Sequence, residues 1–306
     1  MKNFKKVMAV MTCAAMVTTL TACGGSSAKY TQVGFGMVTS VKEGTDSNQV
    51  NTTMATVALD KDGKIAYVDL DVAQQNTNDS KELRTKEEKE LDYNMKGSSG
   101  IGKEWYEQVE FLEGELIGMT ADDVANIETY EKNAEHTTVP AEGTDIAAGC
   151  TIDIGSFQEA IAKAFDNMTE ISAEKIGAGE DISVSNNQVN TTTASVALDK
   201  DGKIVWSYID VAQTKAADEV RSKKEKKEDY NMKGSSAIGK EWYEQVQFLE
   251  EKLVGMTADD VANIETYEKN AEHTTVPAEG TDIASGCTID IGAFQAALAE
   301  AFETAK

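Results

Sequence analysis

Two nearly identical ten-residue segments gather the most reactive residue types of this chain. TDIAAGCTID occupies residues 144–153, and TDIASGCTID returns at residues 281–290. Each combines an acid, a glycine, a thiol and, at Thr151 or Thr288, a hydroxyl that could act as a nucleophile or an attachment point. No general base accompanies that hydroxyl in the sequence, so the pattern does not favour a hydrolase.

The remaining candidates for acid–base or metal chemistry are few. The only histidines are His136 and His273, one in each of two polar loops. No histidine or cysteine spacing matches a metal site, and a lone histidine lacks the second group that catalysis requires. We therefore expect no metal and no catalytic residue, with both histidines structural or inert.

A second motif resembles a phosphate-binding Walker loop. GSSGIGK at residues 97–103 fits its first seven positions, but Glu104 stands where a serine or threonine should hold magnesium. The copy GSSAIGK fails in the same way at Glu241. A glutamate there repels phosphate, which argues against a nucleotide triphosphatase. Backbone N–H groups at this helix start could still bind another anion, together with Ser98, Ser99, Ser235 and Ser236.

The elements that must position these residues are predicted to be strands, followed along the chain by helices. Alternating apolar residues flank Asp62-Gly63 and predict a hairpin. Residues 104–118 then carry an apolar helical face and a glycine stop. Thr120 and Asp123 predict a capped short helix, and residues 150–165 begin in strand-like alternation and turn helical. This order predicts an α+β fold built on a small antiparallel sheet.

The whole pattern occurs twice. Residues 118–147 are identical to residues 255–284, an offset of 137. This period is too long for a solenoid unit and fits a whole domain. We predict two tandem homologous domains, repeat 1 at residues 30–168 and repeat 2 at residues 175–306.

The N-terminus has the features of a secretory signal. Three lysines within the first six residues precede an apolar run that ends at Leu20. Leu20-Thr21-Ala22-Cys23 resembles a bacterial lipobox, in which the cysteine is lipidated and becomes the first mature residue. We expect a signal peptide over residues 1–22 and a tether over residues 23–29. The protein would then be anchored to the cell membrane by lipid, facing outside the cytoplasm.

The net negative charge of the chain argues against anionic partners. The chain has 29 basic and 53 acidic residues, and removal of residues 1–22 takes away three lysines, leaving a net charge of −27. Such a surface repels nucleic acid and anionic lipid. Cys150 and Cys287 occupy equivalent positions in the repeats, and we expect both to be buried and unpaired.

The segment from Asp145 to Thr151 resembles the flavinylation pattern D-x-x-[ST]-G-A-T of FMN-binding domains. That family includes the FMN-carrying subunits of sodium-pumping NADH:quinone reductases and surface lipoproteins with two such domains. The resemblance implies a phosphoester from the threonine hydroxyl to FMN, made by a separate flavin transferase. It assigns the cofactor site to Thr151, Thr288, Asp145, Asp282, Gly149 and Gly286. The glycine would let the bulky group approach, and the helix start downstream would offer N–H donors to the phosphate.

Two departures from the family pattern leave an alternative open. Cysteine replaces the alanine of the pattern, and Asp153 and Asp290 stand two places after the threonine. In a strand, that carboxylate would share a face with the phosphoester and repel it. It could instead cap the following helix and point away. A degenerate domain that keeps the fold without the flavin is the corresponding alternative.

The resemblance implies an electron carrier more than an enzyme. FMN on Thr151 and Thr288 would take electrons from a membrane quinol or flavoenzyme and pass them outward. The alternative is a surface lipoprotein of the same fold, without flavin, that binds a small ligand near residues 98–103 and their copy.

Overall fold

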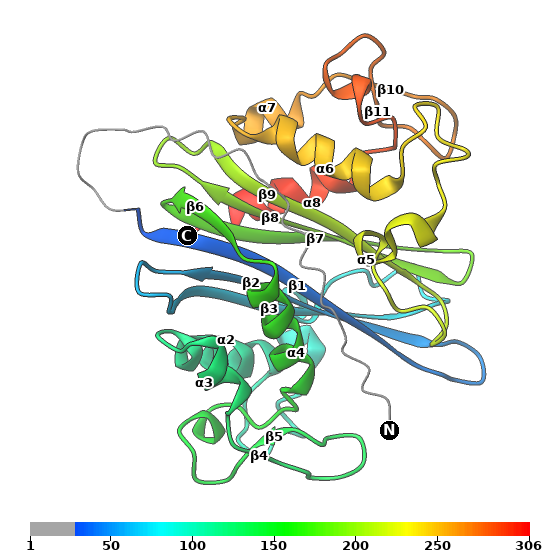
Figure 1. The fold of residues 1–306 in the computed structure, drawn as a ribbon. Coiled ribbons are helices and arrows are strands. Elements are labelled where there is room, and N and C mark those ends of the chain that lie inside the picture. Colours follow the sequence, from blue (N-terminus) through cyan, green and yellow to red (C-terminus); the bar gives the residue numbers. More distant parts are fainter. Residues whose placement is uncertain (1–27) are drawn as a thin grey trace, which may run out of the picture.

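The computed structural model describes residues 28–306. The expected signal peptide, Cys23 and nearly all of the tether lie outside this range. The described chain is mixed α and β with antiparallel sheets, as the sequence predicts. Figure 1 shows the sheets of the two repeats at the centre of the molecule, with helices on their outer sides.

Repeat 1 begins with a meander of three long strands. They are β1 (Tyr30–Lys42), β2 (Gln49–Leu59) and β3 (Ile65–Asn76). Gly63 lies in the predicted turn with φ +74°, a conformation that glycine adopts at no steric cost. The sheet order is β3-β2-β1-β6, where β6 (Thr169–Ala173) pairs antiparallel with β1.

Helices and short turns complete repeat 1. They are α1 (Lys86–Lys89), the 3-10 helix η1 (Glu90–Tyr93), α2 (Trp105–Leu116), α3 (Ala121–Ala125), the 3-10 helix η2 (Ile146–Ala148) and α4 (Gly155–Asp166). The two-residue strands β4 (Thr129–Tyr130) and β5 (Val139–Pro140) pair with each other. Thr120 and Asp123 form the predicted reciprocal cap of α3.

Repeat 2 follows the same order through its last helix, with a three-stranded sheet and no counterpart of β6 among the described residues. Its strands are β7 (Lys175–Ser185), β8 (Gln188–Leu198), β9 (Ile204–Thr214), β10 (Thr266–Tyr267) and β11 (Val276–Pro277). Its helices are α5 (Lys223–Lys226), η3 (Lys227–Tyr230), α6 (Trp242–Leu253), α7 (Ala258–Ala262), η4 (Ile283–Ser285) and α8 (Gly292–Glu303).

Glycines let the last helix of each repeat lie directly on the sheet. A Cβ at Gly34 would sit 2.0 Å from the Ala164 carbonyl oxygen of α4, and one at Gly36 would sit 1.9 Å from that of Ala160. No side chain fits at such distances, so β1 needs glycine at both positions.

The face of each sheet opposite its helices packs against the other repeat. Two hydrophobic clusters, each with residues from both repeats, lie at this interface. One contains Phe35, Met37, Val50, Met54, Ala73, Ile182, Val189 and Ala212. The other contains Tyr30, Val33, Ala58, Tyr67, Ala173, Ile176 and Ala197. Each sheet is therefore buried on both faces.

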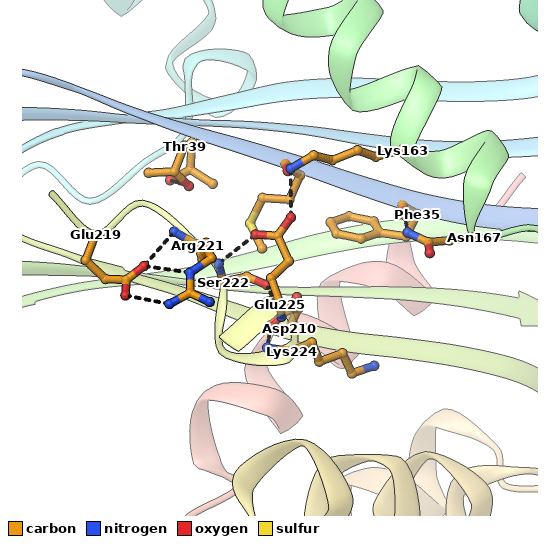
Figure 2. Close-up of polar contacts among 12 residues, drawn as sticks. Phe35, Thr39, Lys163, Asn167, Asp210, Glu219, Arg221, Ser222, Lys224 and Glu225 are labelled. Atoms are coloured by element: carbon orange, nitrogen blue, oxygen red, sulfur yellow. Dashed lines mark hydrogen bonds and ion pairs between the residues drawn. The ribbon is translucent and has the colours of Figure 1, made fainter. Parts of the chain in front are cut away.

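Polar contacts close one edge of this interface (Figure 2). The Lys163 ammonium of α4 donates to the Glu225 carboxylate of repeat 2 at 2.7 Å and to the Met37 carbonyl at 2.9 Å. Asn167, just after α4, donates to the Phe35 carbonyl at 3.1 Å. The Phe35 ring stacks on Tyr208 of repeat 2 with centroids 5.0 Å apart.

One local prediction is wrong. Residues 150–154 form no strand; they run irregularly from η2 to α4, because their apolar side chains pack separately into the core and not as one face of a sheet. Residues 169–174, between the two predicted repeats, contain β6, which extends the sheet of repeat 1.

Candidate functional site

The predicted threonine of each repeat lines a cleft, and Thr288 also borders a second cavity. The repeat 1 cleft has a volume of about 430 Å³ and is lined by Thr151, Ser98, Ser99 and His136, among others. The repeat 2 cleft, of about 600 Å³, is lined by the equivalent residues Thr288, Ser235, Ser236 and His273. Both volumes lie in the range of small-molecule sites, roughly 300–1,000 Å³.

A buried glutamine joins the threonine to the serine loop. The backbone N–H and the hydroxyl of Thr151 both donate to Gln108 Oε1, at 2.9 and 3.1 Å. Gln108 Nε2 donates in turn to Ser99 Oγ at 3.2 Å and to the Lys103 carbonyl at 3.4 Å. Gln108 has no exposed surface, so this network fixes its amide.

The same network exists in repeat 2. Gln245 Oε1 accepts from the N–H and hydroxyl of Thr288 at 2.9 and 3.2 Å, and Gln245 Nε2 donates to Ser236 at 3.1 Å. Sequence reasoning missed both glutamines. The available signal was a polar residue on the apolar face of the helix at residues 105–116.

Glu104 has a structural role that explains why a Walker loop fails here. Its side chain is 3 % exposed, and it accepts from the Met95 N–H at 2.7 Å while forming the reciprocal N-terminal cap of α2 with Glu107. The carboxylate is thus committed to backbone donors and leaves no place for magnesium.

Asp153 caps α4, as one of the two sequence alternatives proposes. Its Oδ1 accepts from the Gly155 N–H at 3.0 Å and its Oδ2 accepts from the Thr138 N–H at 2.8 Å. Asp290 makes the same contacts at 2.9 Å each. The expected phosphate donor at the start of α4 is therefore already occupied by a carboxylate. The charge of that carboxylate is offset by two backbone dipoles.

The other predicted cofactor residues lie outside the cleft lining. Asp145 is exposed at the start of η2, and Asp282 pairs with Lys252 at 2.6 Å. A Cβ at Gly149 would lie 2.4 Å from the Phe111 ring, and Gly286 has the same relation to Phe248. The glycines therefore make room for an aromatic ring of the protein, and their expected role toward a ligand stays a prediction.

The cysteines behave as expected for buried apolar residues. Cys150 and Cys287 are free and fully buried. Burial raises the pKa of each thiol to about 11, so both stay protonated at neutral pH. Neither is a reactive neighbour of the threonine that follows it.

A lysine that the sequence analysis did not single out lies in each cleft. The Lys86 ammonium sits 5.2 Å from the centre of the Tyr93 ring and 5.4 Å from that of Trp105. Lys223 lies 5.2 and 5.3 Å from Tyr230 and Trp242. Burial lowers the pKa of each lysine to about 8. Trp105 is 3 % exposed, so it is a core residue whose edge reaches the cleft.

The arrangement can hold an anionic or hydrogen-bonding ligand against aromatic side chains. It brings together the predicted threonine, serines and histidine of each repeat. Among residues 28–306, no group of three or more histidine, cysteine or acidic side chains could hold a metal ion. Within the same residues, no helix is long and apolar enough to span a membrane.

Comparison with known protein families, with curated proteins and with solved structures finds no match.

Proposed function

We propose that this protein is a lipid-anchored extracytoplasmic electron carrier with FMN esterified to Thr151 and Thr288. Each repeat would be an FMN-binding-like domain, loaded by a separate flavin transferase. The flavin would supply the redox chemistry, accepting electrons from a membrane quinol or flavoenzyme and passing them outward. The observation that supports this most is that both threonine hydroxyls line clefts of small-molecule size with aromatic walls.

The residues around Thr151 fit an attachment site. Its hydroxyl donates to Gln108 Oε1, and this contact leaves the oxygen lone pairs free for bond formation. Tyr93, Trp105 and Phe157 supply aromatic surface in the same cleft. The negative charge of the Asp153 carboxylate would repel a phosphoester, but this carboxylate accepts hydrogen bonds from two backbone N–H groups.

Co-expression with a flavin transferase tests the proposal. The purified protein should be yellow and should keep its colour after denaturation and gel filtration, because the flavin is covalent. A colourless protein with several transferases would favour the alternative of a fold that has lost its flavin.

Gln108 offers a site-specific version of this test. Gln108→Leu should lower flavin occupancy at Thr151 and leave Thr288 as the internal reference, because Gln245 is untouched. Equal occupancy at both sites would mean that the glutamine does not position the hydroxyl.

The membrane anchor is proposed on the lipobox alone. Cys23→Ala should abolish labelling by a fatty-acid analogue and release the protein from membranes. Unchanged labelling would exclude lipidation at this residue.

A further inference from the structure

Each cleft contains a lysine that has no carboxylate partner within the described residues. Neither Lys86 nor Lys223 takes part in any ion pair found among residues 28–306. Both lysines are partly buried and lie over two aromatic rings. Lys132 and Lys269 also line the clefts without an ion pair, but they are exposed. In a chain with 53 acids and 29 bases, the absence of an ion pair is therefore notable for the two partly buried lysines.

A serine hydroxyl in the same cleft has a proton to donate. Ser99 Oγ accepts from the N–H groups of Ile101 and Lys103 at 3.4 Å and from Gln108 Nε2 at 3.2 Å. In all three bonds the oxygen accepts, so its O–H is left to donate, and no hydrogen bond donated by it is found among residues 28–306. Ser236 has the same three donors and the same free O–H.

Most acids that line the clefts are already engaged. Asp153 and Asp290 each accept two backbone N–H bonds, and Glu135 pairs with Lys42 at 2.8 Å. Glu272, which lines the repeat 2 cleft, is exposed and is in no ion pair found among the described residues. The lysine ammonium and the serine hydroxyl thus face the cleft beside aromatic side chains, with no ion pair for the lysine found among residues 28–306. The charges of Asp71 and Asp210 act on the two lysines only from beyond ion-pair distance. This combination suits an anionic group carried by a planar ring system.

We infer that Lys86 with Ser99, and Lys223 with Ser236, form a phosphate subsite in each cleft that binds FMN non-covalently. The inference rests on the proposed function for the identity of the ligand. The side-chain amide of Gln108 bridges the two hydroxyls, because its Nε2 donates to Ser99 and its Oε1 accepts from Thr151. A phosphate held at this subsite would therefore lie next to the oxygen that the proposed ester uses, both before and after attachment.

The test compares FMN with riboflavin, which lacks the phosphate. Protein made without a transferase, with its unmodified mass verified, is titrated with each flavin by fluorescence. FMN should bind roughly tenfold or more tightly than riboflavin at neutral pH, the effect of one charge-assisted contact. Lys86→Met with Lys223→Met should remove this preference and leave riboflavin affinity within about twofold.

A matched control removes two other lysines from the same clefts. Lys132 and Lys269 line them but are more exposed, and no ring contact is found for them among the described residues. Lys132→Met with Lys269→Met should keep most of the preference for FMN. Ser99→Ala with Ser236→Ala should reduce it.

Two results would overturn the subsite. One is equal affinity of the wild type for FMN and riboflavin. The other is a Lys86→Met and Lys223→Met variant that weakens both flavins equally, as lost packing alone would do. The outcomes also separate the two proposals. A charge preference without covalent flavin in co-expressed protein keeps the subsite and rejects the ester. Covalent flavin in a protein that shows no preference for FMN over riboflavin would keep the ester and reject the subsite.

Discussion

The hydroxyl oxygens of Thr56 and Ser195 lie 2.7 Å apart, fully buried between the two repeats. These residues occupy equivalent positions, 139 residues apart, in β2 and β8. Because a two-fold rotation brings equivalent residues next to each other, this contact places a pseudo-two-fold axis beside Thr56 and Ser195. The interface is thus isologous, like that of a symmetric dimer, within one chain.

The hydroxyl pair should show strong coupling between its two members. Thr56→Val leaves the Ser195 hydroxyl buried without a partner, at a cost of about 1–3 kcal/mol of unfolding free energy. Adding Ser195→Ala should recover most of that loss, because no polar atom is then left unpaired. Urea unfolding of the two single variants and the double variant measures the coupling. Additive losses would contradict it.

Repeat 1 alone should associate with itself. A fragment of residues 30–174 keeps β6 but exposes the apolar face that repeat 2 covers in the whole chain. We expect a cooperative melt whose midpoint rises with protein concentration, and a dimer by sedimentation velocity. A stable monomer at all concentrations would show that the interface is not needed, as independent domains would predict.

Glu113 and Glu250 form a matched pair for a pH test. Each accepts from an edge-strand N–H, that of Leu70 at 2.7 Å or that of Ile209 at 2.6 Å. Among residues 28–306, only Glu250 of the two has an ion-pair partner, Lys224 at 2.5 Å. Burial, and then the charge of Asp69, raise the pKa of Glu113 to about 9.

A raised folded-state pKa means that the folded protein binds more protons than the unfolded chain. Stability that Glu113 contributes below about pH 4.5 is therefore lost as the pH rises toward about 9. Glu113→Gln should flatten this decline and stabilise the protein at alkaline pH. Glu250→Gln should destabilise it by removing the partner of Lys224. Urea unfolding across this pH range is the measurement, and a Glu113→Gln variant with unchanged pH dependence would contradict the assignment.

The flavin preference of the clefts should depend on pH. Burial lowers the pKa of Lys86 to about 8, with Asp71 opposing and Lys89 reinforcing the shift. The ammonium is therefore lost between about pH 7 and about pH 9, and the preference for FMN over riboflavin should fall across that range. Glu135, His136 and Asp153 also line the cleft, so the Lys86→Met and Lys223→Met variant, expected to show no such fall, is the reference.

Local signals in the sequence predicted the local structure. The Asp62-Gly63 hairpin, the helix from Trp105 to Leu116 and the Thr120 cap are confirmed because turn conformation, apolar periodicity and capping act over a few residues. The strand expected at residues 150–154 is wrong because its alternation was too short to outweigh tertiary packing.

The cleft itself was beyond sequence reasoning. Lys86, Ser99, His136 and Thr151 come from separate segments, and only the fold brings them to one place. The burial of both sheet faces is visible in the sequence: Phe35 and Met37, on the interface face of β1, are as apolar as a helix-covered face would be.

Site-resolved mass spectrometry of protein co-expressed with a flavin transferase tests the central proposal most directly. We expect two FMN additions in the wild type, one in Thr151→Ala, one in Thr288→Ala and none in the double variant, with folding unchanged. Thr151→Ser should retain some attachment because it keeps the oxygen. No addition in the wild type with any transferase, or an addition that survives in the double variant, would contradict the account.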